Sequence, residues 1–141
     1  MNNLIDTTHR HTFHRNDVLD WGGWLATGNF PFVTTFITIC SLICFYFLQS
    51  YPLTFAPGGV DMLWQCLTCH LVHWNTEHLF WSLGTFAVLG CLCEHTIPMA
   101  FYRALAVSAF TIPAAMLFLS GADAFPYGGI SGVDSALFAL P

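Results

Sequence analysis

One serine and one histidine of this chain have surroundings that suit acyl-transfer chemistry. Ser131 stands between glycines in the sequence Gly129-Ile130-Ser131-Gly132, and His78 opens an apolar stretch earlier in the chain. A serine hydroxyl becomes a nucleophile when a base takes its proton, and an imidazole can act as that base or as a donor to an oxyanion. For either role the two side chains must lie at one depth on neighbouring helices.

Both residues belong to stripes of side chains with helical spacing. The first stripe contains His78, Ser82 and Thr85, and the second contains Ser131, Asp134, Ser135 and Phe138. Polar side chains inside a membrane usually face the interior of a helix bundle or a water-filled cavity. Gly129 and Gly132 remove bulk beside Ser131, which allows helices to approach closely. We therefore expect the two stripes to meet, with Thr85 and Ser135 serving packing rather than chemistry.

The composition indicates that lipid surrounds most of the chain. Of 141 residues, 55% are hydrophobic and only 8% are charged, whereas soluble domains carry about 25% charged residues. The basic residues are Arg10, Arg15 and Arg103, with no lysine. Nucleic-acid binding needs a basic surface that follows phosphates, so we expect no nucleic-acid partner.

The apolar segments predict an all-α, polytopic transmembrane helix bundle. We expect full spans at about 32–50, 78–93 and 98–120, and the start of a fourth at 130–140. A crossing helix needs about 20 apolar residues, and a partial span does not satisfy its backbone in lipid. The chain is therefore expected to be the N-terminal part of a longer protein. It divides into a polar N-terminal segment, 1–31, and an incomplete membrane domain, 32–141.

The arginines indicate the orientation of these spans. Arg10 and Arg15 precede the first predicted span, and Arg103 follows two crossings, so all three fall on one side. Positive charge is enriched in cytoplasmic loops, which places the N-terminus in the cytoplasm. His78 and Ser131 are then on the outer side. The expected location is the inner membrane of a bacterium.

The segment before the second predicted span is mixed in character. It reads "DMLWQCLTCHLVHW", which is too polar to span a membrane and too apolar for a free loop. We expect it to lie at the interface or to re-enter the membrane. Asn75 or Thr76 is expected to cap the helix that follows.

Two stretches together resemble one known family. The residues from Trp64 to Glu94, "WQCLTCHLVHWNTEHLFWSLGTFAVLGCLCE", resemble the first loop and second transmembrane helix of the rhomboid family of intramembrane serine proteases. The sequence "GISG" around Ser131 resembles the GxSG motif at the head of that family's fourth helix. The resemblance covers about residues 32–141. It implies Ser131 as the nucleophile, its own amide as an oxyanion donor, and His78 as the oxyanion-side histidine.

The resemblance also implies supporting residues, and the chain departs from the family in places. His73, Trp64, Gly129 and Gly132 are implied as supports for the loop and the site, and Glu94 as a structural acid. Ser82 stands where many members have an asparagine oxyanion donor, so its shorter hydroxyl is a possible replacement. Gln65 stands where many have arginine.

The general base is the third departure. The family's base histidine lies on a sixth helix, beyond Pro141. We therefore expect residues 1–141 alone not to hydrolyse peptide bonds.

The implied function is cleavage of peptide bonds in or near transmembrane segments of membrane proteins. The implied partners are transmembrane protein substrates and the lipid bilayer, and this chemistry needs no metal or organic cofactor. An alternative is a catalytically inactive rhomboid-like protein that binds transmembrane clients. The altered Ser82 position keeps that alternative open.

A cysteine motif offers further alternatives. Cys66, Cys69 and His70 fit the C-x-x-C-H pattern of c-type haem attachment, so a membrane-anchored haem protein is a second alternative. With His73 the same residues have the ligand types of a zinc site. A Cys66–Cys69 disulfide is another possibility on the outer side.

Overall fold

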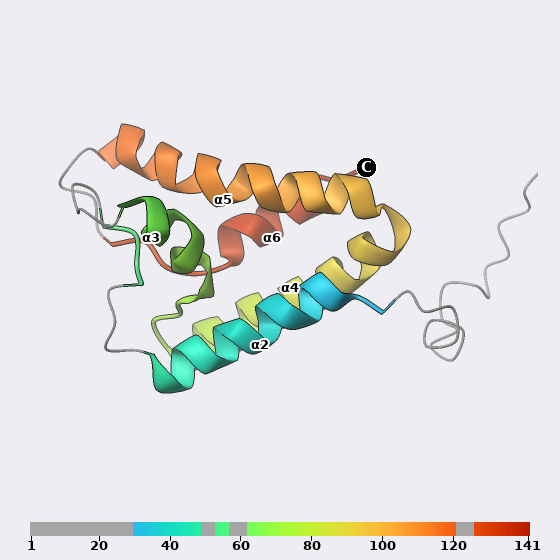
Figure 1. Cartoon of the computed structure of the whole chain (residues 1–141), viewed down its shortest axis with the longest axis horizontal. Coiled ribbons are helices and arrows are strands. Elements are labelled where there is room, and N and C mark those ends of the chain that lie inside the picture. The colour runs from blue at the N-terminus through green and yellow to red at the C-terminus, as the bar shows by residue number, and fades with distance from the viewer. Residues whose placement is uncertain (1–29, 49–52, 57–61, 121–125) are drawn as a thin grey trace, which may run out of the picture. The chain divides into compact units, whose positions relative to one another are not determined.

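The computed structural model describes residues 30–48, 53–56, 62–120 and 126–141, and within these ranges the regular structure is helical apart from one β-bridge (Figure 1). The α-helices in these described ranges are α2 (Phe32–Phe47), α3 (Met62–Thr68), α4 (Thr76–Thr96), α5 (Pro98–Ser120) and α6 (Ser131–Phe138), with a short 3-10 helix, Cys69–Leu71, directly after α3. The predicted all-α class is confirmed. All of these helices belong to one compact unit, Pro31–Pro141. Most of the predicted polar segment 1–31 lies outside the described residues.

In the described ranges one helix is long and apolar enough to cross a membrane, at Pro98–Leu119 in α5. It coincides with the predicted span 98–120. Helix α2 is apolar but has 16 residues, which is about 24 Å of helix against a hydrocarbon core of about 30 Å. Helix α4 has 21 residues but is more polar. The spans predicted at 32–50 and 78–93 therefore remain predictions.

Local signals explain where α4 begins. Asn75 is its N-cap, and the Asn75 side-chain oxygen accepts the backbone N–H of His78 at 2.7 Å. This bond satisfies one of the amides that lack an intrahelical partner. The predicted cap is confirmed for Asn75. Because of this cap, α4 starts before the apolar stretch does, at Thr76.

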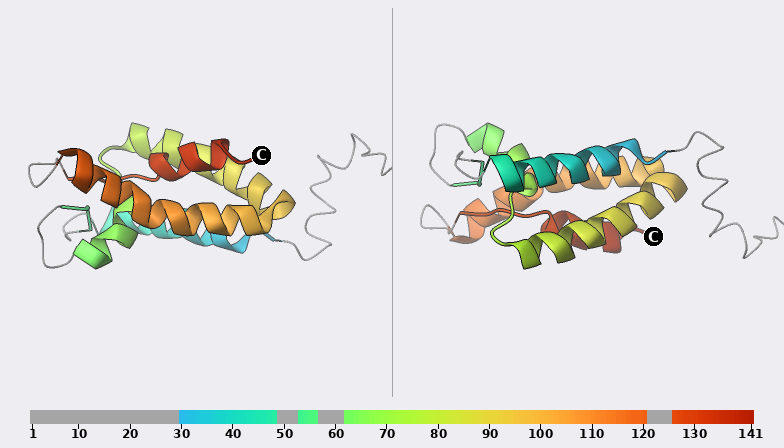
Figure 2. Two further views of the ribbon diagram at one scale, coloured as in Figure 1. Left: turned by 90° about the horizontal axis from the view of Figure 1, so that it is seen from above. Right: turned by 90° about the horizontal axis from the view of Figure 1, so that it is seen from below.

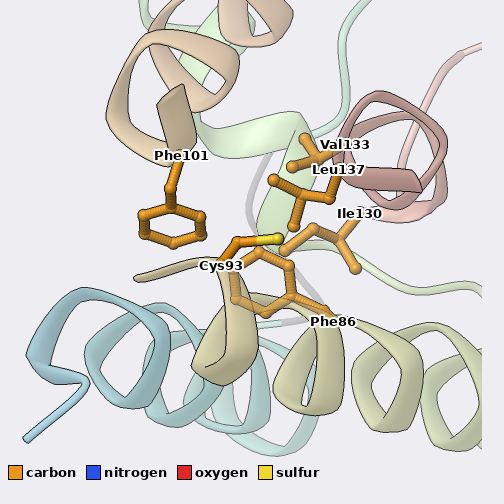
Figure 3. Packing of buried hydrophobic residues seen from close by; sticks show 6 residues of the cluster. All are labelled: Phe86, Cys93, Phe101, Ile130, Val133 and Leu137. Atoms are coloured by element: carbon orange, nitrogen blue, oxygen red, sulfur yellow. The ribbon is translucent and has the colours of Figure 1, made fainter. Parts of the chain in front are cut away.

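Helix α4 packs against α2, α5 and α6. Figure 1 shows α6 between α4 and α5. Buried side chains from α4, α5 and α6, and from the residue before α6, form the core shown in Figure 3. They are Phe86, Cys93, Phe101, Ile130, Val133 and Leu137. The position of α6 is therefore set by apolar packing on two sides.

The end of α4 holds the start of α2. The Glu94 carboxylate accepts the N–H of Val33 at 3.0 Å, the N–H of Thr34 at 2.9 Å and the Thr34 hydroxyl at 2.8 Å. First-turn amides lack intrahelical acceptors and favour negative charge. Gly90 allows the approach, since a Cβ there would lie 2.7 Å from the Thr34 hydroxyl oxygen. Helices α2 and α4 consequently run antiparallel, and Glu94 has the structural role that was expected of it.

Candidate active site

The loop before Ser131 is held through one glycine. Gly129 has a φ of 131°, a backbone conformation that residues other than glycine rarely adopt. Its N–H donates to the Cys69 carbonyl at 2.9 Å, and its carbonyl accepts the Tyr127 hydroxyl at 2.9 Å. Ser131 follows as the first residue of α6 and is exposed. Both polar backbone groups of Gly129 are therefore fixed just before the serine.

His78 lies directly against this loop. Its Nε2 atom is 2.8 Å from the place where a Cβ on Gly129 would be. Helices α4 and α6 pack together, and His78 and Ser131 lie near the first residues of their helices. Figure 2 shows the two helices neighbouring each other in both views. The structure therefore brings the His78 imidazole to the loop that carries Ser131, and only glycine at position 129 leaves room for it.

The remaining members of the two stripes are arranged differently. On α4, Ser82 is buried and Thr85 is half-buried. On α6, Ser135 is exposed like Ser131, but Asp134 is only 7% exposed. The prediction that Asp134 shares the face of Ser131 is wrong. A step of three residues turns a helix by about 300°, so Asp134 is offset by about 60° from Ser131 around the helix axis. This offset is enough to place Asp134 on the buried side of α6.

Asp134 is also unusual in its bonding. Its Oδ1 atom is buried, and among the described residues it has no hydrogen-bond partner. Val133 and Leu137, its neighbours on the buried side of α6, are core residues. Buried polar atoms are rarely left without a partner. Packing of α6 does not require this buried carboxylate oxygen, so Asp134 adds a polar group to the start of α6.

His73 lies behind His78. The two ring centroids are 5.5 Å apart, and His73 is 4% exposed. Burial, and to a lesser degree the neighbouring His78, lower the pKa of His73 to about 4, while the Leu71 backbone acts in the opposite direction. Within the described part of the chain neither ring nitrogen has a hydrogen-bond partner. His73 is thus a neutral, buried ring beside the candidate site, in the loop that it was expected to support.

Sequence reasoning named His70 only as a candidate haem or zinc ligand, and it missed Tyr127. Burial lowers the pKa of His70, an effect opposed by the backbone of Ala109 and of Gly129, and its Nε2 lies 3.4 Å from the Ala109 carbonyl oxygen. The Tyr127 ring packs edge-on against His70, with centroids 5.9 Å apart. The only signal for Tyr127 was its place two residues before Gly129.

Trp64 and Gln65 differ in their surroundings. Trp64 is 60% exposed. Gln65 is buried, and its side-chain oxygen accepts the N–H of Ala56 at 3.0 Å. Gln65 therefore tethers the segment around Ala56 to α3.

An apolar cavity of about 400 Å³ lies between α4 and α6, lined by Phe80, Trp81, Gly84, Thr85, Val88, Leu89 and Phe138. A smaller cavity of about 270 Å³ includes His73 in its lining, together with Thr54 and Cys44. Ser131 lines neither cavity. The serine is instead at the exposed face of α6, in line with Ser135 and Phe138.

One thiol of the cysteine motif is not accessible for haem attachment. Cys69 is fully buried, and burial raises the pKa of its thiol to about 12. Haem attachment requires both thiols to react, and a buried protonated thiol is inert. Cys66 and Cys69 are free thiols. Among the described residues no group of three or more His, Cys, Asp or Glu side chains is placed to hold a metal ion, so Cys66, Cys69, His70 and His73 do not converge as zinc ligands.

Neither a protein-family model nor a curated protein matches this chain. The resemblance to rhomboid proteases therefore rests on the quoted motifs and on their order along the chain.

Proposed function

We propose that this chain carries the nucleophile and oxyanion-side part of an intramembrane serine endopeptidase of the rhomboid type. The observation that supports the proposal best is the approach of the His78 imidazole to Gly129, two residues before Ser131. The proposed substrates are membrane proteins cleaved in or near a transmembrane helix. The general base is a histidine from outside residues 1–141, as the resemblance implies.

In the proposed reaction the Ser131 hydroxyl attacks the scissile carbonyl carbon while the base takes its proton. Ser131 is the first residue of α6, so its N–H has no intrahelical acceptor and is free to donate to the oxyanion. His78 donates a second hydrogen bond. The intermediate then collapses, the amine leaves with the proton from the base, and water releases the acyl group in the same way.

Ser82 contributes little to this chemistry in the proposal. Its side chain is buried, and a hydroxyl is shorter than the asparagine amide found in many family members. Loss of one oxyanion donor lowers the rate by about 10²–10³-fold in other serine proteases. The proposed enzyme is therefore slow and depends strongly on His78.

The second candidate is a catalytically inactive protein that binds transmembrane clients. The observation that favours it is the apolar cavity between α4 and α6, whose flanking Phe80, Trp81 and Val88 are exposed. An apolar helix with small side chains suits such a surface. The same experiment distinguishes the two candidates.

The test uses the natural full-length protein in lipid vesicles with a fluorophosphonate probe and a fluorescent transmembrane substrate. We expect labelling at Ser131, and we expect Ser131→Ala to abolish labelling and to lower cleavage by about 10⁴-fold or more. Ser135→Ala is the matched control, since Ser135 is exposed one turn further along α6. Binding of the substrate without labelling or cleavage would favour the client-binding candidate.

A further inference from the structure

The side chain of Tyr127 reaches the peptide groups on both sides of Ser131. Its hydroxyl donates to the Gly129 carbonyl at 2.9 Å. A Cβ on Gly132 would lie 3.0 Å from the same oxygen, so the hydroxyl also lies against the first turn of α6. One phenol oxygen thus contacts the residue two before the serine and approaches the residue directly after it.

Tyr127 is itself held from two directions. Its backbone pairs with Phe55 through two hydrogen bonds of 2.9 Å, which form an isolated antiparallel bridge. Its ring packs edge-on against His70. These contacts come from segments far earlier in the chain. The phenol is therefore also held by segments outside α6.

The hydroxyl remains a donor over the whole working range of pH. Burial, with a smaller effect from Cys69, raises the pKa of Tyr127 to about 12. A neutral phenol has one O–H to donate. Its hydrogen bond to the Gly129 carbonyl is therefore not lost by ionisation.

We propose that Tyr127 is a positioning residue, whose hydroxyl fixes the Gly129–Ile130 peptide and thereby the place of the loop before Ser131 against the His78 imidazole. This inference rests on the proposed function of Ser131. In a trans peptide the carbonyl and the next N–H point in opposite directions, and no peptide is cis among the described residues. Because the Gly129 carbonyl is bonded to the phenol hydroxyl, the Ile130 N–H points away from that hydroxyl. The Ile130 carbonyl accepts the N–H of Asp134 at 3.0 Å, so the Ser131 amide is held by α6 itself. Without the Tyr127 hydroxyl it is the Gly129–Ile130 peptide that can rotate, and the place of Gly129 against His78 is then no longer fixed.

The experiment compares Tyr127→Phe with Tyr102→Phe in the natural full-length protein in vesicles. Each change removes one phenol hydroxyl, and the Tyr102 hydroxyl bonds to Glu94 at 3.4 Å, away from the serine. We expect Tyr127→Phe to slow fluorophosphonate labelling of Ser131 by about 10- to 100-fold, through the maximal rate and not the half-saturating probe concentration. Amide hydrogen exchange should become faster across residues 128–133. Tyr102→Phe should change neither measurement.

The outcomes separate this inference from the proposed function. Labelling of Tyr127→Phe at the unchanged rate would overturn the inference and leave the role of Ser131 intact. A folded unmodified protein that does not label at Ser131 would overturn both. If Tyr127→Phe melts too early to assay, it is compared with Tyr102→Phe at a lower temperature at which both variants are folded. Equal labelling rates there would overturn the inference.

Discussion

Two buried polar side chains at opposite ends of α4, Glu94 within the helix and His73 just before it, differ in their hydrogen bonding. At the C-terminal end, Glu94 is buried and its carboxylate accepts three hydrogen bonds from the start of α2. At the N-terminal end, His73 is equally buried, yet among the described residues neither ring nitrogen is bonded. Buried polar groups that hold a fold together are normally paired. Hydrogen bonding therefore explains why Glu94 is buried at the paired end, and it does not explain why His73 is buried at the unpaired end.

The largest expected effect is at the paired end. Glu94→Gln replaces one acceptor oxygen by an N–H₂ group that faces the amides of Val33 and Thr34. We expect the free energy of unfolding to fall by about 2–4 kcal/mol, because hydrogen bonds to a charged group are lost and buried donors remain unpaired. Chemical denaturation in detergent measures the change.

The control at the other end of the same helix is Glu77→Gln. Glu77 is exposed in the first turn of α4, where a negative charge contributes about 0.3–1 kcal/mol. Equal losses for Glu94→Gln and Glu77→Gln would show that the bonds of Glu94 do not hold α2, and the contrast between the two ends would disappear.

A smaller effect is expected at Gly129. Gly129→Ala places a Cβ 2.8 Å from His78 Nε2 and requires a φ of 131°, a conformation that destabilises other residues by about 1–3 kcal/mol. We expect the variant to lose about that much stability and to lose labelling at Ser131 as His78 is displaced. Thermal melting and probe labelling are measured on the same sample.

Gly84→Ala is the matched control for this glycine. A Cβ on Gly84 would meet nothing within 4 Å, and alanine favours a helix over glycine by about 0.8–1.0 kcal/mol. Gly84→Ala should therefore be neutral or stabilising. If Gly129→Ala behaves like Gly84→Ala, then His78 does not lie where the candidate site needs it.

The smallest effect comes from pH. The folded pKa of His73 is about 4, below its ordinary value of 6.5, so the unfolded chain binds more protons than the folded chain between these values. Stability is then complete above about pH 6.5 and falls as the pH is lowered toward 4. By pH 5 we expect a loss on the order of 1–2 kcal/mol. Melting temperatures measured from neutral to acidic pH record this slope.

His73→Gln should flatten this dependence, since glutamine does not titrate. The remaining slope belongs to groups such as His70, whose pKa is also lowered by burial. An unchanged slope in His73→Gln would mean that the unpaired ring is not what makes this end sensitive to acid.

The sequence predicted what depends on local spacing and chemistry. The Asn75 cap and the helix at 98–120 were both predictable, because a cap signal and an apolar run act over a few residues. The approach of His78 to the serine loop was also expected, since helical spacing places polar residues at the same end of two helices.

The features that depend on how α4, α5 and α6 pack together could not be predicted from the sequence. Asp134 is buried because α6 fits between α4 and α5, and a helical stripe does not reveal which edge faces that gap. Tyr127 is placed beside Gly129 by its pairing with Phe55, which lies about half of the chain's length earlier. Such long-range pairings leave no periodic signal in the sequence.

The Phe55–Tyr127 bridge has a consequence for biosynthesis. Its two strands of backbone are separated by α3, α4 and α5, so the ribosome must deliver all three helices before the bridge can close. The loop that carries Ser131 is therefore joined to the segment before α3 only after α5 has been made.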